Sequence, residues 1–139
     1  MSNANLDQLQ VNDAIPFLQL PPISRTTLAL YAGASGDHNP IHIDIDFAKA
    51  AGLDDVFAHG MLSAAYLGRL VSNWAGQSRM RKLQLRFTSI THVHDAPLCT
   101  GKVLERFTTD GEERLRVELQ CANQKGDVKL TGEAIVAAH

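Results

Sequence analysis

The sequence has few of the residues that mark several large classes of protein. It contains only two cysteines, Cys99 and Cys121, and both lie in segments that alternate like strands. So few cysteines exclude a disulfide framework, and we interpret both as small core residues in a reducing compartment. A basic surplus is also missing, since 13 Lys and Arg stand against 15 Asp and Glu. This balance disfavours a nucleic-acid partner.

Long hydrophobic runs are missing as well. No stretch reaches the length of about 18 apolar residues that spans a bilayer, and the first fourteen residues, MSNANLDQLQVNDA, lack the basic and apolar parts of a signal peptide. We therefore expect a soluble cytoplasmic protein with no membrane association. The 139 residues, 45% of them hydrophobic, suit a single domain over 1–139 with a core of its own.

The first half of the sequence predicts helices after a short extended segment at 14–20. Ser24 offers an N-cap for a helix over 25–34, and a short helix over 46–52 ends at Gly52. Residues 59–76 carry an apolar stripe at i,i+4 spacing beside a second stripe of small residues. This pattern is typical of a buried helix.

The second half alternates with period two, which predicts half-buried antiparallel strands. The alternation runs through Leu83, Leu85 and Phe87 and again through 114–121. Further strands are expected at 98–107 and 127–137, with turns at "DG" (110) and "KG" (125). The pattern predicts an α+β fold, in which a four-strand antiparallel meander and an extra N-terminal strand wrap around one long helix.

Ionisable residues gather in the loop segment SGDHNPIHIDIDFAKAAG, residues 35–52. Asp37 and His42 flank a turn stiffened by Pro40, which could aim a carboxylate and an imidazole at one water molecule. Such a pair suits acid–base chemistry at neutral pH. On spacing alone, helix caps and surface groups remain an open alternative. Asn39 before proline is a favoured turn residue.

Other chemistries have less support in this loop. His38 and His42 are four apart, but Pro40 lies between them and the glutamate of an HExxH motif is missing. A calcium loop starting at Asp37 would need glycine where His42 stands. A GxSxG elbow is also missing. We therefore expect neither a metal nor a cofactor.

The segment SGDHNPIHID, followed 17 residues after His42 by HGML, resembles the MaoC-like hydratase family. This family comprises (R)-specific enoyl-CoA hydratases and related 3-hydroxyacyl dehydratases, and its motif runs D-x-N-P-x-H followed by an HG that opens the central helix. The resemblance covers nearly the whole chain. It implies a single hot-dog fold, an antiparallel sheet wrapped around a long central helix, and a role in fatty acid metabolism.

The resemblance also implies roles for individual residues. Asp37 and His42 would be the catalytic pair, and the N–H of Gly60, free of any Cβ, would bind the thioester oxygen. We assign Asn39, His59 and Ser63 to the substrate-binding surroundings. Asn39 and His59 would mainly orient the loop and the entry to the helix, and burial as an ordinary helix residue is the alternative for Ser63.

The function implied is hydration of trans-2-enoyl thioesters, or dehydration of (R)-3-hydroxyacyl thioesters, carried by coenzyme A or acyl carrier protein. A homodimer with two sites at its interface is expected. One alternative is a hot-dog acyl thioesterase, which the D-x-N-P-x-H loop disfavours. Another is a non-catalytic acyl-binding subunit of a heteromeric dehydratase, which the presence of both Asp37 and His42 disfavours.

Overall fold

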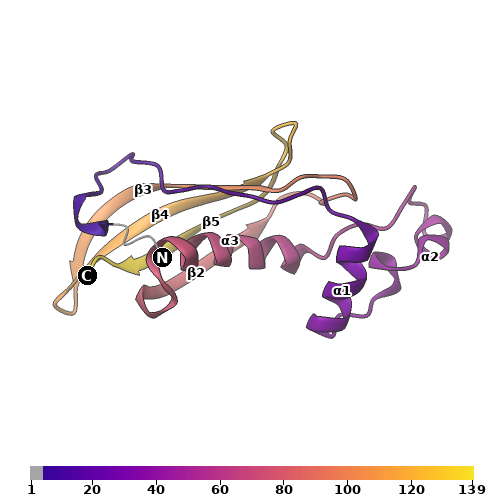
Figure 1. The fold of residues 1–139 in the computed structure, drawn as a ribbon, viewed down its shortest axis with the longest axis horizontal. Coiled ribbons are helices and arrows are strands. Elements are labelled where there is room, and N and C mark those ends of the chain that lie inside the picture. The colour runs from indigo at the N-terminus through magenta and orange to yellow at the C-terminus, as the bar shows by residue number, and fades with distance from the viewer. Residues whose placement is uncertain (1–4) are drawn as a thin grey trace.

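A computed structural model describes residues 5–139, and it shows a curled sheet packed on one long helix (Figure 1). Single 3-10 turns also occur at Leu6–Gln8, Pro40–His42 and Gln77–Arg79. Within residues 5–139 no helix is long and apolar enough to cross a membrane. The helices are α1 (Arg25–Ser35), α2 (Ile45–Ala50) and α3 (Gly60–Ala75), and the strands are β1 (Leu18–Gln19), β2 (Met80–Phe87), β3 (Leu98–Thr109), β4 (Glu112–Ala122) and β5 (Val128–Ala137).

Capping residues define both ends of α1 and the start of α2. The Ser24 hydroxyl accepts a hydrogen bond from the Thr27 N–H at the start of α1, and Gly36 ends that helix in the left-handed region at φ 77°. The Asp44 carboxylate accepts from the N–H groups of Asp46 and Phe47 at the start of α2. The helix bounds therefore agree with the predicted ranges to within a few residues.

The five strands are all antiparallel and lie in the order β1-β3-β4-β5-β2. Asp110 and Gly111 join β3 to β4 with φ 51° and 74°, as a two-residue type I′ turn requires. The predicted four-strand meander is wrong for β2, which pairs with β5 and not with β3. Alternation identifies the buried face of a strand but not its neighbour, and residues 88–97 carry the chain across the sheet.

The main hydrophobic core lies between α3 and the sheet. Leu67, Leu70 and Trp74 of α3 belong to one buried cluster with Val103 and Leu119 of the strands. Gly68 of α3 lies against β2, where a Cβ would be in ordinary contact with the Leu83 side chain at 3.7 Å. Cys99 on β3 and Cys121 on β4 lie opposite one another, and both are buried and reduced. This confirms that they are core residues.

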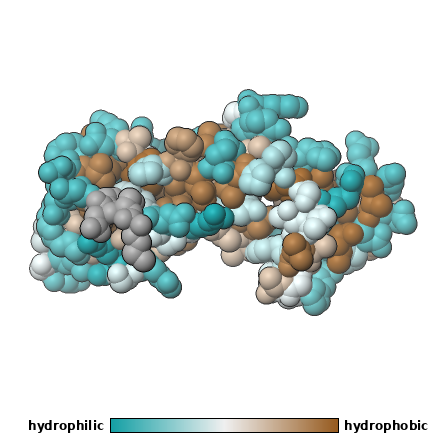
Figure 2. Space-filling view, in the orientation of Figure 1, coloured by the Kyte–Doolittle hydropathy of each residue, from teal (hydrophilic) through white to brown (hydrophobic). Residues whose placement is uncertain are grey.

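A second, smaller core supports a separate lobe made by α1 and α2. Figure 1 shows this lobe beyond the N-terminal end of α3, away from the sheet, and Figure 2 shows the surface hollowed between the two parts. This core joins residues of α1, α2, the segment before α3 and α3 itself: Ile23, Leu28, Ala48, Val56, Ala58 and Leu62. The loop between α1 and α2 is thereby held next to the start of α3.

Candidate active site

The loop that carries Asp37 and His42 is held by hydrogen bonds of its own. A carboxylate oxygen of Asp37 accepts from the Asn39 N–H at 3.3 Å, and the Asn39 side chain accepts from the Ile41 N–H at 3.1 Å. Pro40 then begins a single 3-10 turn that ends at His42. The segment is therefore a structured turn, as the sequence predicts, and Asn39 shapes it.

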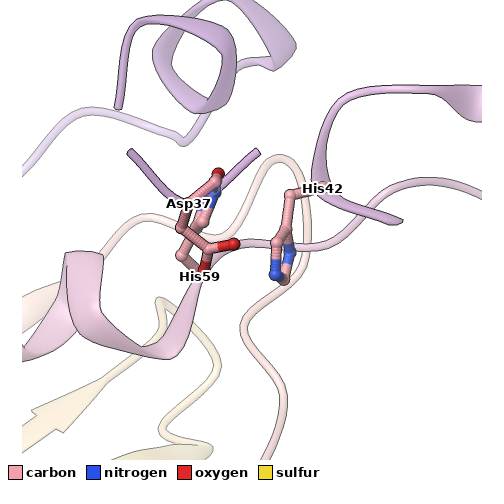
Figure 3. A group of neighbouring side chains, drawn as sticks. All are labelled: Asp37, His42 and His59. Atoms are coloured by element: carbon pink, nitrogen blue, oxygen red, sulfur yellow. Dashed lines mark hydrogen bonds between the residues drawn. The ribbon is translucent and has the colours of Figure 1, made fainter. Parts of the chain in front are cut away.

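The two ends of this turn face one another. One carboxylate oxygen of Asp37 and one ring nitrogen from each of His42 and His59 all lie within 4.8 Å of one another (Figure 3). Asp37 is exposed, whereas His42 is 8% exposed. Two hydrogen bonds of about 2.8 Å each span such a gap, so one water molecule can bridge the carboxylate and an imidazole.

The contacts of His42 determine which of its nitrogens is free. Its Nδ1 lies 2.7 Å from the main-chain oxygen of Phe57. A carbonyl oxygen only accepts hydrogen bonds, so Nδ1 carries the proton and the lone pair of the neutral ring is at Nε2. The Phe57 ring packs edge-on against the imidazole at 4.9 Å. His42 therefore presents a basic nitrogen in a fixed orientation.

His59, the residue before α3, lies beneath His42. The two rings stack at a centroid distance of 4.0 Å, and the Tyr31 ring packs edge-on against His59 at 4.9 Å. The Nε2–H of His59 donates to the main-chain oxygen of Asp37 at 3.1 Å. Because His59 is 1% exposed, burial lowers its pKa and keeps the ring neutral.

Gly60 is the first residue of α3 and is exposed. The N–H groups in the first turn of a helix have no acceptor within the helix, and the helix dipole makes them attractive to negative charge. A Cβ on Gly60 would lie 2.9 Å from the ring of Phe87. Phe87 therefore takes the space that the missing side chain leaves.

Ser63 lies one turn further along α3 and is fully buried at 0% exposure. Its hydroxyl has no hydrogen-bond partner among residues 5–139. Asn39 is exposed on the loop between α1 and α2, whereas His59 and Ser63 are enclosed by protein. The substrate-binding roles of these three residues stay predictions.

Asp37, His42 and His59 together offer the donor types that bind a transition metal. An imidazole lone pair lies in the plane of its ring, however, and these two rings stack with only 29° between their planes. Their lone pairs therefore run side by side and do not converge on one ion. Nδ1 of His42 and Nε2 of His59 also already carry protons that are donated to carbonyls, so this geometry suits water better than a metal.

Three aromatic residues around the site were not identified from the sequence: Tyr31, Phe57 and Phe87. Phe57 and Tyr31 contact the histidines, and the Phe87 ring lies next to Gly60. These aromatic residues contact the site only through tertiary packing. No local sequence pattern therefore indicated that they would lie beside the polar motif.

Fold and site together define a class: hot-dog proteins in which a carboxylate and an imidazole meet beside the N-terminus of the central helix. Residues 10–105 match the family model described as the MaoC like domain. That match covers more than half of the chain. The protein therefore belongs to the MaoC-like domain family.

Relatives of this chain include named hydratases and dehydratases. The solved structure of the R-hydratase PhaJ1 from Pseudomonas aeruginosa superimposes with a TM-score of 0.85 at 30% identity, covering 97% of this chain and 86% of that one. A 3-hydroxybutyryl-CoA dehydratase from Methylorubrum extorquens is 30% identical over 82% of this chain and 72% of its own length. Fatty acid synthase subunit beta from Saccharomyces cerevisiae is 32% identical over 96% of this chain.

This chain spans only a small part of the fatty acid synthase subunits that it matches, 6% of the yeast subunit's length. The match therefore concerns one region of a much larger protein.

Burial of neutral His59 predicts a pH dependence of folding stability. The unfolded chain binds a proton at His59 near the ordinary pKa of 6.5, and the folded chain binds it only at lower pH. Stability therefore falls as pH drops below about 6.5, by at most about 1.4 kcal/mol per pH unit for one group. When urea unfolding is measured at pH 7.5 and at pH 5.5, the free energy of unfolding should fall less between these two pH values for His59→Phe than for the wild type.

The matched control is His92→Phe, which replaces an exposed histidine and should keep the wild-type loss. Equal losses for all three proteins would show that His59 is not the titrating group.

Proposed function

We propose that this protein catalyses the reversible hydration of trans-2-enoyl thioesters to (R)-3-hydroxyacyl thioesters. The observation that carries the proposal is that Asp37 and His42 approach within 4.8 Å beside the exposed first residue of α3. The names of the relatives, a hydratase and a dehydratase among them, support the same reaction class. The acyl carrier would be coenzyme A or acyl carrier protein.

In the proposed reaction the water oxygen bonds to the β-carbon of the enoyl group and one water proton goes to His42 Nε2. This nitrogen is the free one because Nδ1–H donates to Phe57. The Asp37 carboxylate holds the water, and the pair returns a proton to the α-carbon. Negative charge gathers on the thioester oxygen meanwhile, where the Gly60 N–H and the positive end of α3 stabilise it. Dehydration is the same sequence reversed.

The Asp37–His42 pair is tested with two variants and crotonyl-CoA. Asp37→Asn keeps the size of the side chain and removes its charge, and His42→Ala removes the base. We expect each to lower kcat by about 10²–10⁴, the usual yield of positioned acid–base groups. Hydration is followed by loss of the enoyl absorbance, and chiral analysis of the product should give the (R) alcohol.

The matched control is His38→Ala, because His38 is an exposed histidine of the same loop and lies outside the cluster. Wild-type rates in Asp37→Asn or His42→Ala would refute the assignment. Release of free thiol without hydration would instead indicate a thioesterase, and no turnover of any enoyl thioester would favour the acyl-binding role.

The role proposed for the Gly60 N–H is tested by proline at the first helical position. Proline is well tolerated there, and His59 already has φ −57° and ψ 131°, which a following proline requires. Gly60→Ala adds the same Cβ against Phe87 but keeps the N–H. We expect kcat for Gly60→Pro to lie about 10²–10³ below that of Gly60→Ala, the cost of one oxyanion donor. Equal values would show that this N–H does not bind the oxyanion.

We also propose that two chains assemble through β2. This strand is at an edge of the sheet, paired only on its β5 side, yet it exposes apolar side chains, Leu83 at 39% and Phe87 at 53%. Hydrophobic residues also gather along the middle of the face seen in Figure 2. An unpaired edge of this kind invites pairing with another strand. Because Phe87 contacts Gly60, the partner would adjoin the active site.

Light scattering after size exclusion tests the assembly. We expect a molar mass twice the 15.1 kDa of one chain, and Leu83→Lys should shift the protein toward that single-chain mass. Leu30→Lys is the control, since Leu30 is 71% exposed on α1, away from β2. A single-chain mass for the wild type, or equal behaviour of the two variants, would refute assembly through β2.

A further inference from the structure

His59 has two contacts that suit it to align the proposed catalytic groups. Its ring lies on His42 at 4.0 Å, and its Nε2–H reaches the main-chain oxygen of Asp37 at 3.1 Å. It therefore contacts both residues of the pair. Tyr31, on α1, packs edge-on against the same imidazole, which limits rotation of the ring.

The hydrogen bonds of the two histidines are reciprocal. His42, in the loop, donates to Phe57 just before α3, and His59, at the entry to α3, donates to Asp37 in the loop. Within residues 5–139, the remaining hydrogen bonds of residues 37–39 stay inside residues 35–42. Asp37 is therefore attached to α3, and so to Gly60, through His59.

His59 itself is unsuited to transfer a proton. It is 1% exposed, and its one proton, on Nε2, is donated to a carbonyl oxygen. Its Nδ1 is buried without a partner in the described part of the chain.

We infer that His59 is a positioning residue whose hydrogen bond to the Asp37 carbonyl fixes the carboxylate relative to His42 and Gly60. This inference rests on the proposed hydratase function. Displacing a reacting group by about 1 Å can cost about 10²-fold in rate. Loss of the bond should therefore act on kcat and leave KM nearly unchanged, since the His59 ring is 1% exposed and enclosed by protein.

Three substitutions separate the hydrogen bond from the ring. His59→Gln keeps a side-chain N–H donor at similar reach but has no ring, and His59→Phe keeps a ring but has no donor. His59→Ala has neither. We expect His59→Ala and His59→Phe to lower kcat for crotonyl-CoA hydration by about 10- to 10²-fold. We expect His59→Gln to keep most of the wild-type kcat. His92→Gln is the control, because it makes the same change at an exposed histidine.

Each rate is compared with the thermal midpoint and the folded fraction of the same variant. If the loss in kcat followed the loss in folded protein, or if Gln were no better than Ala, His59 would have only a structural role. Wild-type kcat in His59→Ala together with an inactive Asp37→Asn would overturn this inference and leave the hydratase function standing. An inactive wild type would overturn both.

Discussion

Two hydrogen bonds from imidazoles to main-chain carbonyls connect the loop after α1 to the chain that enters α3. His42 reaches Phe57 at 2.7 Å, and His59 reaches Asp37 at 3.1 Å. Each bond also fixes the tautomer of its ring, because a carbonyl can only accept. The same two contacts therefore set the position of the carboxylate, the free nitrogen of His42 and their distance from the first N–H groups of the helix. Stacking of the rings excludes water from one face of each.

The rest of the fold holds in place the two segments that these hydrogen bonds connect. α3 is anchored along its length by the main core, through Leu67, Leu70 and Trp74, so its N-terminal end has a fixed place. The lobe of α1 and α2 packs on that end through a core of its own. Phe87, at the end of β2, fills the space beside Gly60. An edge strand, a helix start and a loop thus meet at one point, although they are far apart in the sequence.

Much of this arrangement could be predicted from the sequence because it depends on local patterns. The periodicity of residues 59–76 identified α3, and the short, proline-stiffened turn between Asp37 and His42 placed their side chains close together. The partner of β2 could not be predicted, because alternation carries no information about neighbours. The bonds from His42 to Phe57 and from His59 to Asp37 span 15 and 22 residues and depend on how the lobe docks. The contact of Phe87 with Gly60 has the same origin.

The division of the interior into two hydrophobic clusters has a consequence for motion. The cluster between α3 and the sheet includes many large aliphatic side chains, whereas the one beneath α1 and α2 is small. Regions with fewer apolar contacts open at lower free energy than the regions they pack on. The lobe that holds Asp37 and His42 is thus the more readily opened unit, and α3 with the sheet is the more stable support on which it packs.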